Sequence, residues 1–270
     1  MKMHEADCSV LDDWLRAQGS HPSRIPAEGV HIMGDENRSP GKAGLFVAGR
    51  QDGVLVEVCM EWHSAIASIA SRLAPAEILS TFGAYELARA TLPDGFGIWG
   101  PTWYYLATPA LFRPQTCPSV RRMGKDESAS VDRQLFWHAV PEPDSAGFGA
   151  FRGGRLVALA VANRRSEELW EIGIEVRPEA KGTGMGSGVF SAAGRFITHH
   201  GGLILARSAP WNVPSVRLLR RHGLRLVLQD LRLLPVPMRV PPQVLGHPSP
   251  GAALRQYYPA WAMNQDIEFR

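Results

Sequence analysis

The second half of the chain has the clearest pattern of apolar and polar positions. The runs Gly147–Phe151 and Leu156–Ala162 flank four residues, two of them glycines, and this arrangement predicts a β-hairpin. Residues Leu169–Val176 alternate apolar side chains with others, as a strand with one buried face does. The run Leu135–Val140 predicts another strand ahead of the hairpin.

A long helix is predicted after this last strand, because the period of the apolar positions changes from two to between three and four. The helix ends at Gly201-Gly202, a pair that favours helix termination. The apolar residues that share one of its faces are Met185, Val189, Ala193, Phe196 and Ile197.

Shorter elements follow the helix. Leu203–Ala206 predicts a short buried strand, and Asn212 is placed to cap a helix that ends near Gly223. Leu224–Leu231 predicts a last strand. The proline-rich stretch Pro235–Pro250 then predicts an extended tail or linker.

The first half of the chain is less regular. Gly19–Gly44 is rich in Pro, Gly, Ser and Asp, which predicts mostly loop. A hairpin, two helices and a strand are then predicted at Leu45–Arg50 with Val54–Met60, Trp62–Leu73, Pro75–Arg89 and Thr102–Ala107. Pro109–Ser130 is charged and irregular, so we place a domain boundary near residue 125.

These elements predict an α/β (α+β) protein in three parts. Residues 1–125 form a smaller α/β domain, residues 126–234 form a second domain, and residues 235–270 form a proline-rich C-terminal tail. Hairpins of similar length at Gly44–Val58 and Gly147–Val161 leave open whether the first domain is a degenerate repeat of the second.

Composition narrows the class of protein. The chain of 270 residues is 45% hydrophobic and 20% charged, which is ordinary for a globular protein. No apolar run approaches the roughly 20 residues of a membrane span, and the N-terminus does not resemble a signal peptide. A net charge of +3 is too small to indicate nucleic-acid binding. Cys8, Cys59 and Cys117 are far apart and predict neither disulfides nor a metal site, so a reducing cytoplasm fits best.

The residues between the alternating strand and the long helix carry the strongest chemical signal. Lys181, Gly182, Gly184 and Gly186 open the helix. Glycines let a ligand approach the backbone closely, because no Cβ is in the way. The N–H groups at a helix start are unpaired and partly positive, so this junction predicts a site for a diphosphate, to which Lys181 adds a full charge.

Spacing separates three classes of ligand that use such a junction. A dinucleotide motif needs G-x-G-x-x-G, but Ser187 or Val189 stands where its last glycine belongs. A nucleoside-triphosphate loop needs Gly-Lys-Ser/Thr at its end, whereas here the lysine precedes the glycines. The remaining pattern is a basic residue, two positions, glycine, one position and glycine, at Lys181, Gly184 and Gly186.

This pattern resembles the acetyl-coenzyme A (acetyl-CoA) loop of the GNAT acetyltransferase superfamily, written Arg/Gln-x-x-Gly-x-Gly/Ala. The strand before it ends in Val-x-Pro at residues 176–178, as it often does in that family. A second segment, from Asn212 through Ser215 to Gly223, is similar to the Asn-x-x-Ala/Ser … Gly-Phe segment of the same fold. The resemblance covers about residues 130–232 and implies a mixed, mostly antiparallel sheet flanked by helices, here preceded by the smaller α/β domain.

The resemblance also implies a function, namely transfer of acetyl from acetyl-CoA to an amine by direct attack. Acetyl-CoA is then the acyl-donor substrate, and no metal is expected. One strand N–H would face the thioester oxygen as it gains charge. The implied cofactor-binding residues are Ile174 and Val176 through their backbone, the loop residues Lys181, Gly182, Thr183, Gly184, Met185 and Gly186, and Asn212 and Ser215.

The reaction needs a base, because an amine with a pKa near ~10 is protonated at neutral pH. Glu171, at the start of the strand that precedes the loop, is the first candidate and would act through a water. Glu168 is the second candidate. Glu175 shares a face of the strand with Glu171, so it is a further alternative.

Two positions depart from the family pattern. Lys181 replaces the usual Arg or Gln, which keeps the charge but loses the planar fork of donors. Leu219 stands where many members carry a tyrosine general acid. The proton donor to the thiolate is therefore open among His222, Tyr104 and Tyr105, or the thiolate needs no dedicated acid.

Three functional hypotheses remain at this point. The first is an N-acyltransferase acting on a small-molecule amine, with no nucleic-acid or membrane partner and a homodimer left open. The second is a non-catalytic acyl-CoA-binding or sensing module, which the missing tyrosine favours. The third is a transferase of the same fold that modifies a protein terminus or lysine.

Overall fold

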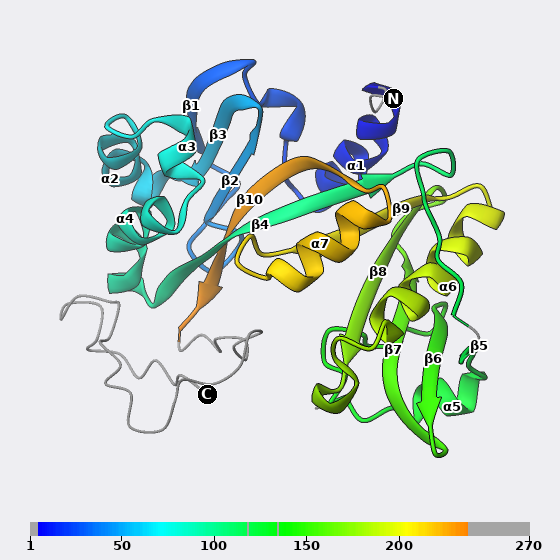
Figure 1. The fold of residues 1–270 in the computed structure, drawn as a ribbon. Coiled ribbons are helices and arrows are strands. Elements are labelled where there is room, and N and C mark those ends of the chain that lie inside the picture. The colour runs from blue at the N-terminus through cyan, green and yellow to red at the C-terminus, as the bar shows by residue number, and fades with distance from the viewer. Residues whose placement is uncertain (1–4, 118, 134, 237–270) are drawn as a thin grey trace. The chain divides into compact units, whose positions relative to one another are not determined.

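The computed structural model describes residues 5–117, 119–133 and 135–236, which fall into two compact units (Figure 1). Unit 1 comprises residues 5–19, 104–208 and 215–227, and unit 2 comprises residues 20–103, 209–214 and 228–236. Each unit buries its own cluster of apolar residues. Two strands, β4 (Phe96–Ala107) and β10 (Arg225–Pro235), have residues in both units.

The sheet of unit 1 has the strand order β4-β9-β8-β7-β6-β5. Each strand from β5 to β8 pairs antiparallel with the next one in that series, whereas β8 and β9 pair in parallel. These strands are β5 (Val120–Arg122), β6 (Ala146–Arg152), β7 (Arg155–Arg164), β8 (Leu169–Val176) and β9 (Leu203–Ser208). The predicted hairpin and the predicted mixed, mostly antiparallel sheet are confirmed.

Helix α6 (Met185–His199) covers one face of this sheet, as its row of apolar residues predicted (Figure 1). Its first turn packs tightly on β8. A Cβ at Gly186 would lie 3.0 Å from Val176 Cγ2 and 3.7 Å from Ile174 Cδ1. The side chains of Ile174 and Val176 therefore point to the α6 face, and alternate residues of β8 point to the other face.

A chain segment without strands covers that other face. Phe136 and Ala139 pack with Leu159 of β7 in a buried cluster, and a Cβ at Gly173 would collide with the carbonyl oxygen of His138. The remaining helices with residues in unit 1 are α1 (Glu5–Ala17), α5 (Lys125–Ala129), α7 (Val213–Arg221) and the 3-10 turn Pro178–Ala180.

Unit 2 has the strand order β1-β3-β2-β10-β4, with helices α2 and α4 beside it (Figure 1). Strand β1 (Glu28–Asp35) runs parallel to β3 (Asp52–Cys59), and β2 (Leu45–Arg50) pairs antiparallel with β3 and β10. Valines of β3 and apolar residues of the helices share one core. The helices are α2 (Met60–Ala70), α3 (Pro75–Ile78), α4 (Thr81–Thr91) and the 3-10 turns Pro22–Arg24 and Leu92–Asp94.

Three predicted elements were wrong. The loop predicted at Gly19–Gly44 contains β1, a strand without a fully buried residue, whose apolar alternation is limited to Val30 and Ile32. The strand predicted at Leu135–Val140 is absent, because Phe136 N–H and Ala139 N–H donate to Asp132 and Phe136 carbonyls in local turns. The helix predicted at Pro75–Arg89 is interrupted, since Ser80 caps a new helix by accepting from Gly83 N–H.

The division into units differs from the boundary expected near residue 125. It falls within β4, between Trp103 and Tyr104, because that long strand has residues in both units. A boundary inside a continuous strand leaves no loop signal in the sequence. The predicted tail at residues 235–270 lies outside the described residues from position 237 onward.

Candidate functional site

Strands β8 and β9 pair over only the first part of β8 and diverge beyond it. Their parallel register joins Leu169–Glu171 to residues 203–205, and no further pair is recorded among the described residues, although both strands continue. The first four residues of β8 are buried and the last four are half-buried. The edge of β8 from residue 173 to 176 that faces away from β7 is therefore open for pairing.

The backbone groups on that open edge can be assigned from neighbouring hydrogen bonds. Arg177 N–H donates to the Val157 carbonyl of β7, so odd-numbered residues at this end of β8 face β7. The Glu168 carbonyl, in contrast, accepts from Leu203 N–H of β9. Because backbone groups alternate between the two edges of a strand, Ile174 and Val176 present their N–H and C=O groups to the open edge.

Glycines occupy alternate positions of the junction that follows β8 and leave the backbone there uncovered. Gly182 and Gly184 have φ values of +76° and +84°, a region that residues with a Cβ rarely occupy, and a Cβ at either position would meet no atom within 4 Å. Gly188 N–H donates to the Gly184 carbonyl, so the N–H groups of the preceding residues lie before the first helical hydrogen bond of α6. No acidic residue stands in the first turn of α6.

Two side chains of this junction have different surroundings. Thr183 Oγ1 donates to the Ala180 carbonyl at 2.7 Å, which holds the loop against the 3-10 turn. Lys181 is exposed, and its ammonium has no ion-pair partner among the described residues. A free cation beside unpaired N–H groups makes the junction attractive to an anion.

Ser187, the third residue of α6, belongs to a hydrogen-bonded chain that the sequence did not reveal. The Nδ1 atom of His222 lies 2.8 Å from the Arg113 carbonyl oxygen, and its Nε2 atom lies 2.8 Å from Ser187 Oγ. Ser187 Oγ also lies 2.7 Å from Gln115 Oε1. His222 is fully buried, which places its ring beneath the helix start rather than in a solvent-facing acid position.

Glu171 lies at the point where β8 and β9 part, and both its oxygens are paired. Its Oε2 atom accepts from Arg165 Nε at 2.8 Å, and its Oε1 atom accepts from Arg207 Nε at 2.6 Å. Burial raises the pKa of this carboxyl, but Arg207 and then Arg165 outweigh burial and hold the pKa below its usual value. The group is therefore an anion at neutral pH and a weak base.

The other candidate bases have contrasting positions. Glu168 is exposed in the turn before β8. Glu175 lies on the face of β8 opposite α6, where its Oε2 atom is 2.6 Å from His138 Nδ1. The ring of His138 lies tilted against that of Trp137, which is 42% exposed. This pair is accessible, but it lies toward the glycine junction rather than at the parting of the strands.

The candidate proton donors are buried. Tyr104, Tyr105 and His222 are each 0% exposed. Leu219, which has no proton to donate, is 1% exposed. Burial raises the pKa of Tyr105, against the opposing effect of Arg220, so its hydroxyl is a poorer acid than usual. The structure thus leaves all three candidate proton donors buried, and none of them is exposed where β8 and β9 diverge.

The second family segment lies at the start of α7. Asn212 immediately precedes the helix, in the position of an N-cap, and its N–H donates to the Ala209 carbonyl at 3.0 Å. Ser215 is half-buried in the first turn. Arg165, in the connection between β7 and β8, and Arg207, on β9, hold Glu171. Both were missed from the sequence, because no spacing rule links them to Glu171.

Unit 1 contains a large cavity near the start of β8. Its volume is about 710 Å³. Arg165 joins this cavity to Glu171, because one guanidinium bonds both Glu171 and Glu142. The lining residues are Glu142, Pro143, Asp144, Ser145, Arg164, Arg165, Ser166, Glu167 and Trp170.

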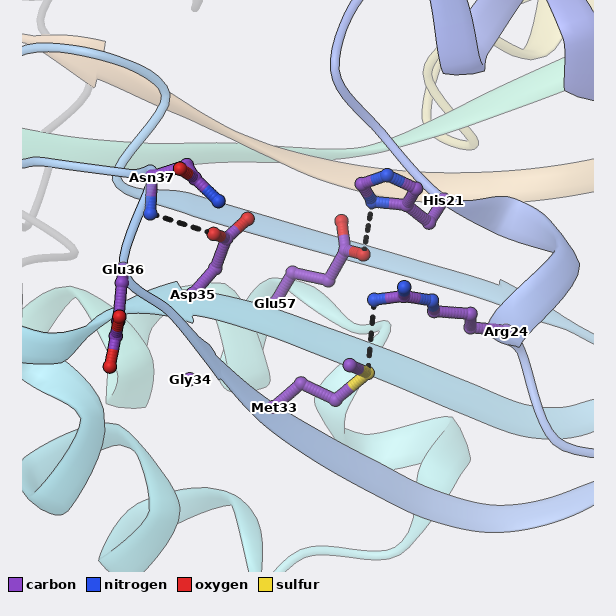
Figure 2. A pocket seen from close by; sticks show the side chains of 8 residues that line it. All are labelled: His21, Arg24, Met33, Gly34, Asp35, Glu36, Asn37 and Glu57. Carbon is purple, nitrogen blue, oxygen red and sulfur yellow. Dashed lines mark hydrogen bonds and ion pairs between the residues drawn. The ribbon is translucent and has the colours of Figure 1, made fainter.

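Unit 2 contains a smaller cavity of about 340 Å³, shown in Figure 2. Its deepest charge is Glu57, which is 2% exposed and bonds His21 Nδ1 at 2.8 Å and Arg38 at 2.7 Å. Arg24 extends toward Met33 from the opposite wall (Figure 2). The buried carboxylate is thus satisfied by unit 2 itself.

Two kinds of feature are absent from the described residues. Among residues 5–236, apart from positions 118 and 134, no group of three or more His, Cys, Asp or Glu is arranged to hold a metal ion. Within the same residues no helix has both the length and the apolar character that crossing a bilayer requires.

Comparison with solved structures finds several acetyltransferases. A GCN5-related N-acetyltransferase from Kribbella flavida is 19% identical with a TM-score of 0.44, over 56% of this chain and 63% of that chain. A GNAT-family acetyltransferase from Colwellia psychrerythraea is 13% identical with a TM-score of 0.41, over 54% and 60%. An aminoglycoside N-acetyltransferase in complex with CoA is 19% identical with a TM-score of 0.34, over 40% and 88%. This chain spans less than two thirds of the length of the first two.

Comparison of the sequence with known families identifies the part of the chain that is similar to acetyltransferases. No curated protein matches the chain. The profile of the acetyltransferase (GNAT) family, however, matches residues 110–224, a stretch that holds β8, the glycine junction, α6, β9 and α7. Residues 110–224 therefore form a domain of the GNAT superfamily of N-acetyltransferases, as the loop at 181–186 led us to expect.

Proposed function

We propose that the chain is an acyl-CoA-dependent N-acyltransferase that transfers acetyl from acetyl-CoA to an amine by direct attack. The observation that carries the proposal is the parting of β8 from β9 beyond Glu171, directly ahead of the bare glycine junction. A strand edge and an anion site follow each other along one segment, and acyl-CoA has an amide-bearing arm joined to a diphosphate in the same order.

The arm would bind as an added strand. The N–H and C=O groups of Ile174 and Val176 would pair with its amides, because they face the open edge. Asn212 and Ser215 would contact the arm from the start of α7. A strand N–H near the parting of the strands would also stabilise the negative charge that develops on the thioester oxygen.

The diphosphate would bind at the glycine junction. Its oxygens would accept from the N–H groups of Gly182, Gly184 and Gly186, with Thr183 and Met185 completing the backbone of the loop. Lys181, whose ammonium has no ion-pair partner among the described residues, would add a charge. No metal is part of this proposal.

Glu171 is our proposed acceptor for the amine proton, through a water, with Glu168 second. The lowered pKa makes Glu171 a weak base, so the fraction of uncharged amine would limit the rate. The proposal therefore predicts that kcat/KM rises about tenfold per pH unit from neutral pH toward the pKa of the amine.

We propose that the amine approaches from the cavity near the start of β8. The carboxylates of Asp144 and Glu167 line that cavity and would attract an ammonium group, and Arg165 connects it to Glu171. A small-molecule amine fits a cavity of about 710 Å³ better than a folded protein does.

A non-catalytic acyl-CoA-binding or sensing module is the second candidate. Two observations favour it: Leu219 is buried where a tyrosine acid is common, and Glu171 is engaged by two arginines. Such a module would use the same arm and diphosphate contacts but would not release the thiol.

Calorimetry with acetyl-CoA tests the binding that both candidates share. Thiol release measured with a panel of amines then separates them, with wild type compared with Glu171→Gln. We expect wild type to turn over at least one amine and Glu171→Gln to be slower. If acetyl-CoA binds but no amine is acetylated, the sensing module is the better account; if acetyl-CoA does not bind, both are wrong.

A further inference from the structure

We propose that His222 positions the Ser187 hydroxyl toward the diphosphate of CoA and takes up a proton when CoA binds. The inference rests on the proposed CoA site at the start of α6, and it adds a proton linkage to that site. His222 would act through Ser187, so it is a positioning residue rather than a catalytic one.

The hydrogen bonds around His222 decide which ring nitrogen can change its protonation. A carbonyl oxygen only accepts, so Nδ1, 2.8 Å from the Arg113 carbonyl, carries a hydrogen in both charge states of the ring. Only Nε2 can lose its proton, and Nε2 lies 2.8 Å from Ser187 Oγ. A neutral His222 therefore accepts from Ser187, and a cationic His222 donates to it.

Ser187 has one hydroxyl proton for two neighbouring acceptors. Its Oγ lies 2.7 Å from Gln115 Oε1 as well as 2.8 Å from His222 Nε2. Beside a neutral His222 the proton is directed to Nε2, and the free lone pairs of Oγ would repel a phosphate oxygen. Beside a cationic His222 the ring donates to Oγ, and the hydroxyl proton becomes available to Gln115 or to a phosphate.

The surroundings of His222 keep it neutral in the absence of a ligand. It is fully buried against the rings of Phe112 and Phe190, and burial lowers its pKa. The bond to the Arg113 carbonyl partly opposes this effect, and the charge of Arg221 adds to it.

Among the residues that the structure describes, no carboxylate forms an ion pair with the His222 ring. The charged side chains adjoining His222 are Arg221, its neighbour on α7, and Arg113, whose Cγ adjoins the site of Gly223. From α6 the groups facing His222 are Ser187 and Phe190, which are uncharged. A diphosphate at the start of α6 would bring negative charge close to the ring and raise its pKa.

Thermodynamic linkage between proton binding and CoA binding fixes the direction in which the Kd for CoA changes with pH. Because CoA would raise the pKa of His222, binding takes up as much as one proton between the pKa values of the free and bound proteins. Within that interval the Kd for CoA weakens up to tenfold for each unit by which the pH rises. Above both pKa values the Kd no longer depends on this group.

Isothermal titration calorimetry with dephospho-CoA tests the linkage. This probe keeps the diphosphate but lacks the 3′-phosphate, whose own proton titrates near ~6 and would obscure the result. Titrations at about pH 6 in two buffers of different ionisation enthalpy report the protons taken up. We expect uptake in wild type, none in His222→Gln, and in Ser187→Ala a smaller uptake with about tenfold weaker binding.

His199→Gln is the matched control, because His199 is exposed at the far end of the same helix and should leave the uptake unchanged. The inference is overturned if wild type binds without proton uptake, or if His222→Gln takes up as many protons as wild type. Should His222→Gln fail to fold, Ser187→Ala decides alone: unchanged affinity and uptake refute the role of Ser187. Absence of dephospho-CoA and CoA binding to wild type would instead refute the proposed function.

Discussion

Strands β3 and β8 both lead into helices, and the two junctions have opposite chemistry. Strand β3 ends at Cys59 and α2 begins at the next residue, with Glu61 in its first turn. Strand β8 is followed by residues 177–184, and the first turn of α6 contains no acid. A carboxylate in the first turn already compensates the positive end of a helix, whereas the bare junction leaves that compensation to a ligand.

The comparison shows that a strand followed by a helix does not by itself make an anion site. At the first junction the side chains of Met60 and Trp62 follow immediately, and Trp62 is buried in the core of unit 2. At the second, Gly182 and Gly184 expose backbone at positive φ. The difference lies in the residues of the first turn rather than in the order of elements.

Both strands also bury a glutamate, Glu57 on β3 and Glu171 on β8. The largest effect on stability is expected when Glu171 is replaced. Replacement of Glu171 by Ala would leave Arg165 and Arg207 without their shared anion, and breaking a buried pair costs about 3–5 kcal/mol. Urea denaturation measures the loss of unfolding free energy. Glu175→Ala is the control, because its partner His138 is exposed and the loss should stay below about 1 kcal/mol. Equal losses in the two variants would contradict the buried network.

The second test places a side chain in the glycine junction between β8 and α6. Gly184→Val forces a β-branched residue to φ of +84° and places methyl groups where phosphate oxygens would lie, so we expect the Kd for CoA to weaken about 100-fold. Gly154→Val carries a similar strain at φ of +76° in the β6–β7 turn and should bind CoA normally. Calorimetry that finds Gly184→Val as tight as wild type would remove the diphosphate site.

The third test uses pH to separate the stabilisation by Glu171 from other effects. Because its pKa is lowered in the folded protein, the charge of Glu171 stabilises the fold above about pH 4.3, the value for an unfolded Glu, and this stabilisation is lost as pH falls through the folded pKa. The difference in unfolding free energy between wild type and Glu171→Gln should therefore shrink on acidification. A difference that stays constant from pH 7 to about pH 2 would show that the charge is not responsible.

The fourth test concerns the lysine of the junction. Lys181→Met removes an exposed cation without an ion-pair partner among the described residues, so the Kd for CoA should weaken about fivefold to tenfold at low salt. The difference should narrow at high ionic strength, because salt screens exposed charges. A salt-independent difference would indicate packing rather than charge.

The smallest effect is expected at the first junction. Glu61→Gln removes the acid from the first turn of α2 without touching unit 1, and CoA affinity should change less than about twofold. A larger change, measured by the same calorimetry, would mean that the first turn of α2 contributes to CoA binding and would undo the contrast between the junctions.

Much of the site could be predicted from the sequence because its signals are local. The hairpin at β6–β7, the strand β8 and the helix α6 each have a regular apolar period, and the structure confirms all three. The loop at 181–186 combines a lysine with glycines at fixed spacing, and the family match at 110–224 includes it.

The missed elements lack such a period. Strand β1 has no fully buried residue and an apolar alternation of only Val30 and Ile32, and it pairs with β3 through backbone groups that any residue supplies. The segment around Phe136 and Ala139 is apolar because it packs on the sheet, not because it extends as a strand. Apolar character alone does not distinguish these two situations.

The sequence by itself predicted which segment we propose to bind a diphosphate, because spacing and glycine conformation act over a few neighbouring residues. Only the tertiary structure decided the partners of Glu171 and Ser187, since Arg207 and His222 are separated from them by 36 and 35 positions. Contacts of that kind depend on how strands and helices are brought together, and that arrangement leaves no fixed spacing in the chain. The open edge of β8 has the same origin: it exists because β9 diverges from it, not because of any residue within it.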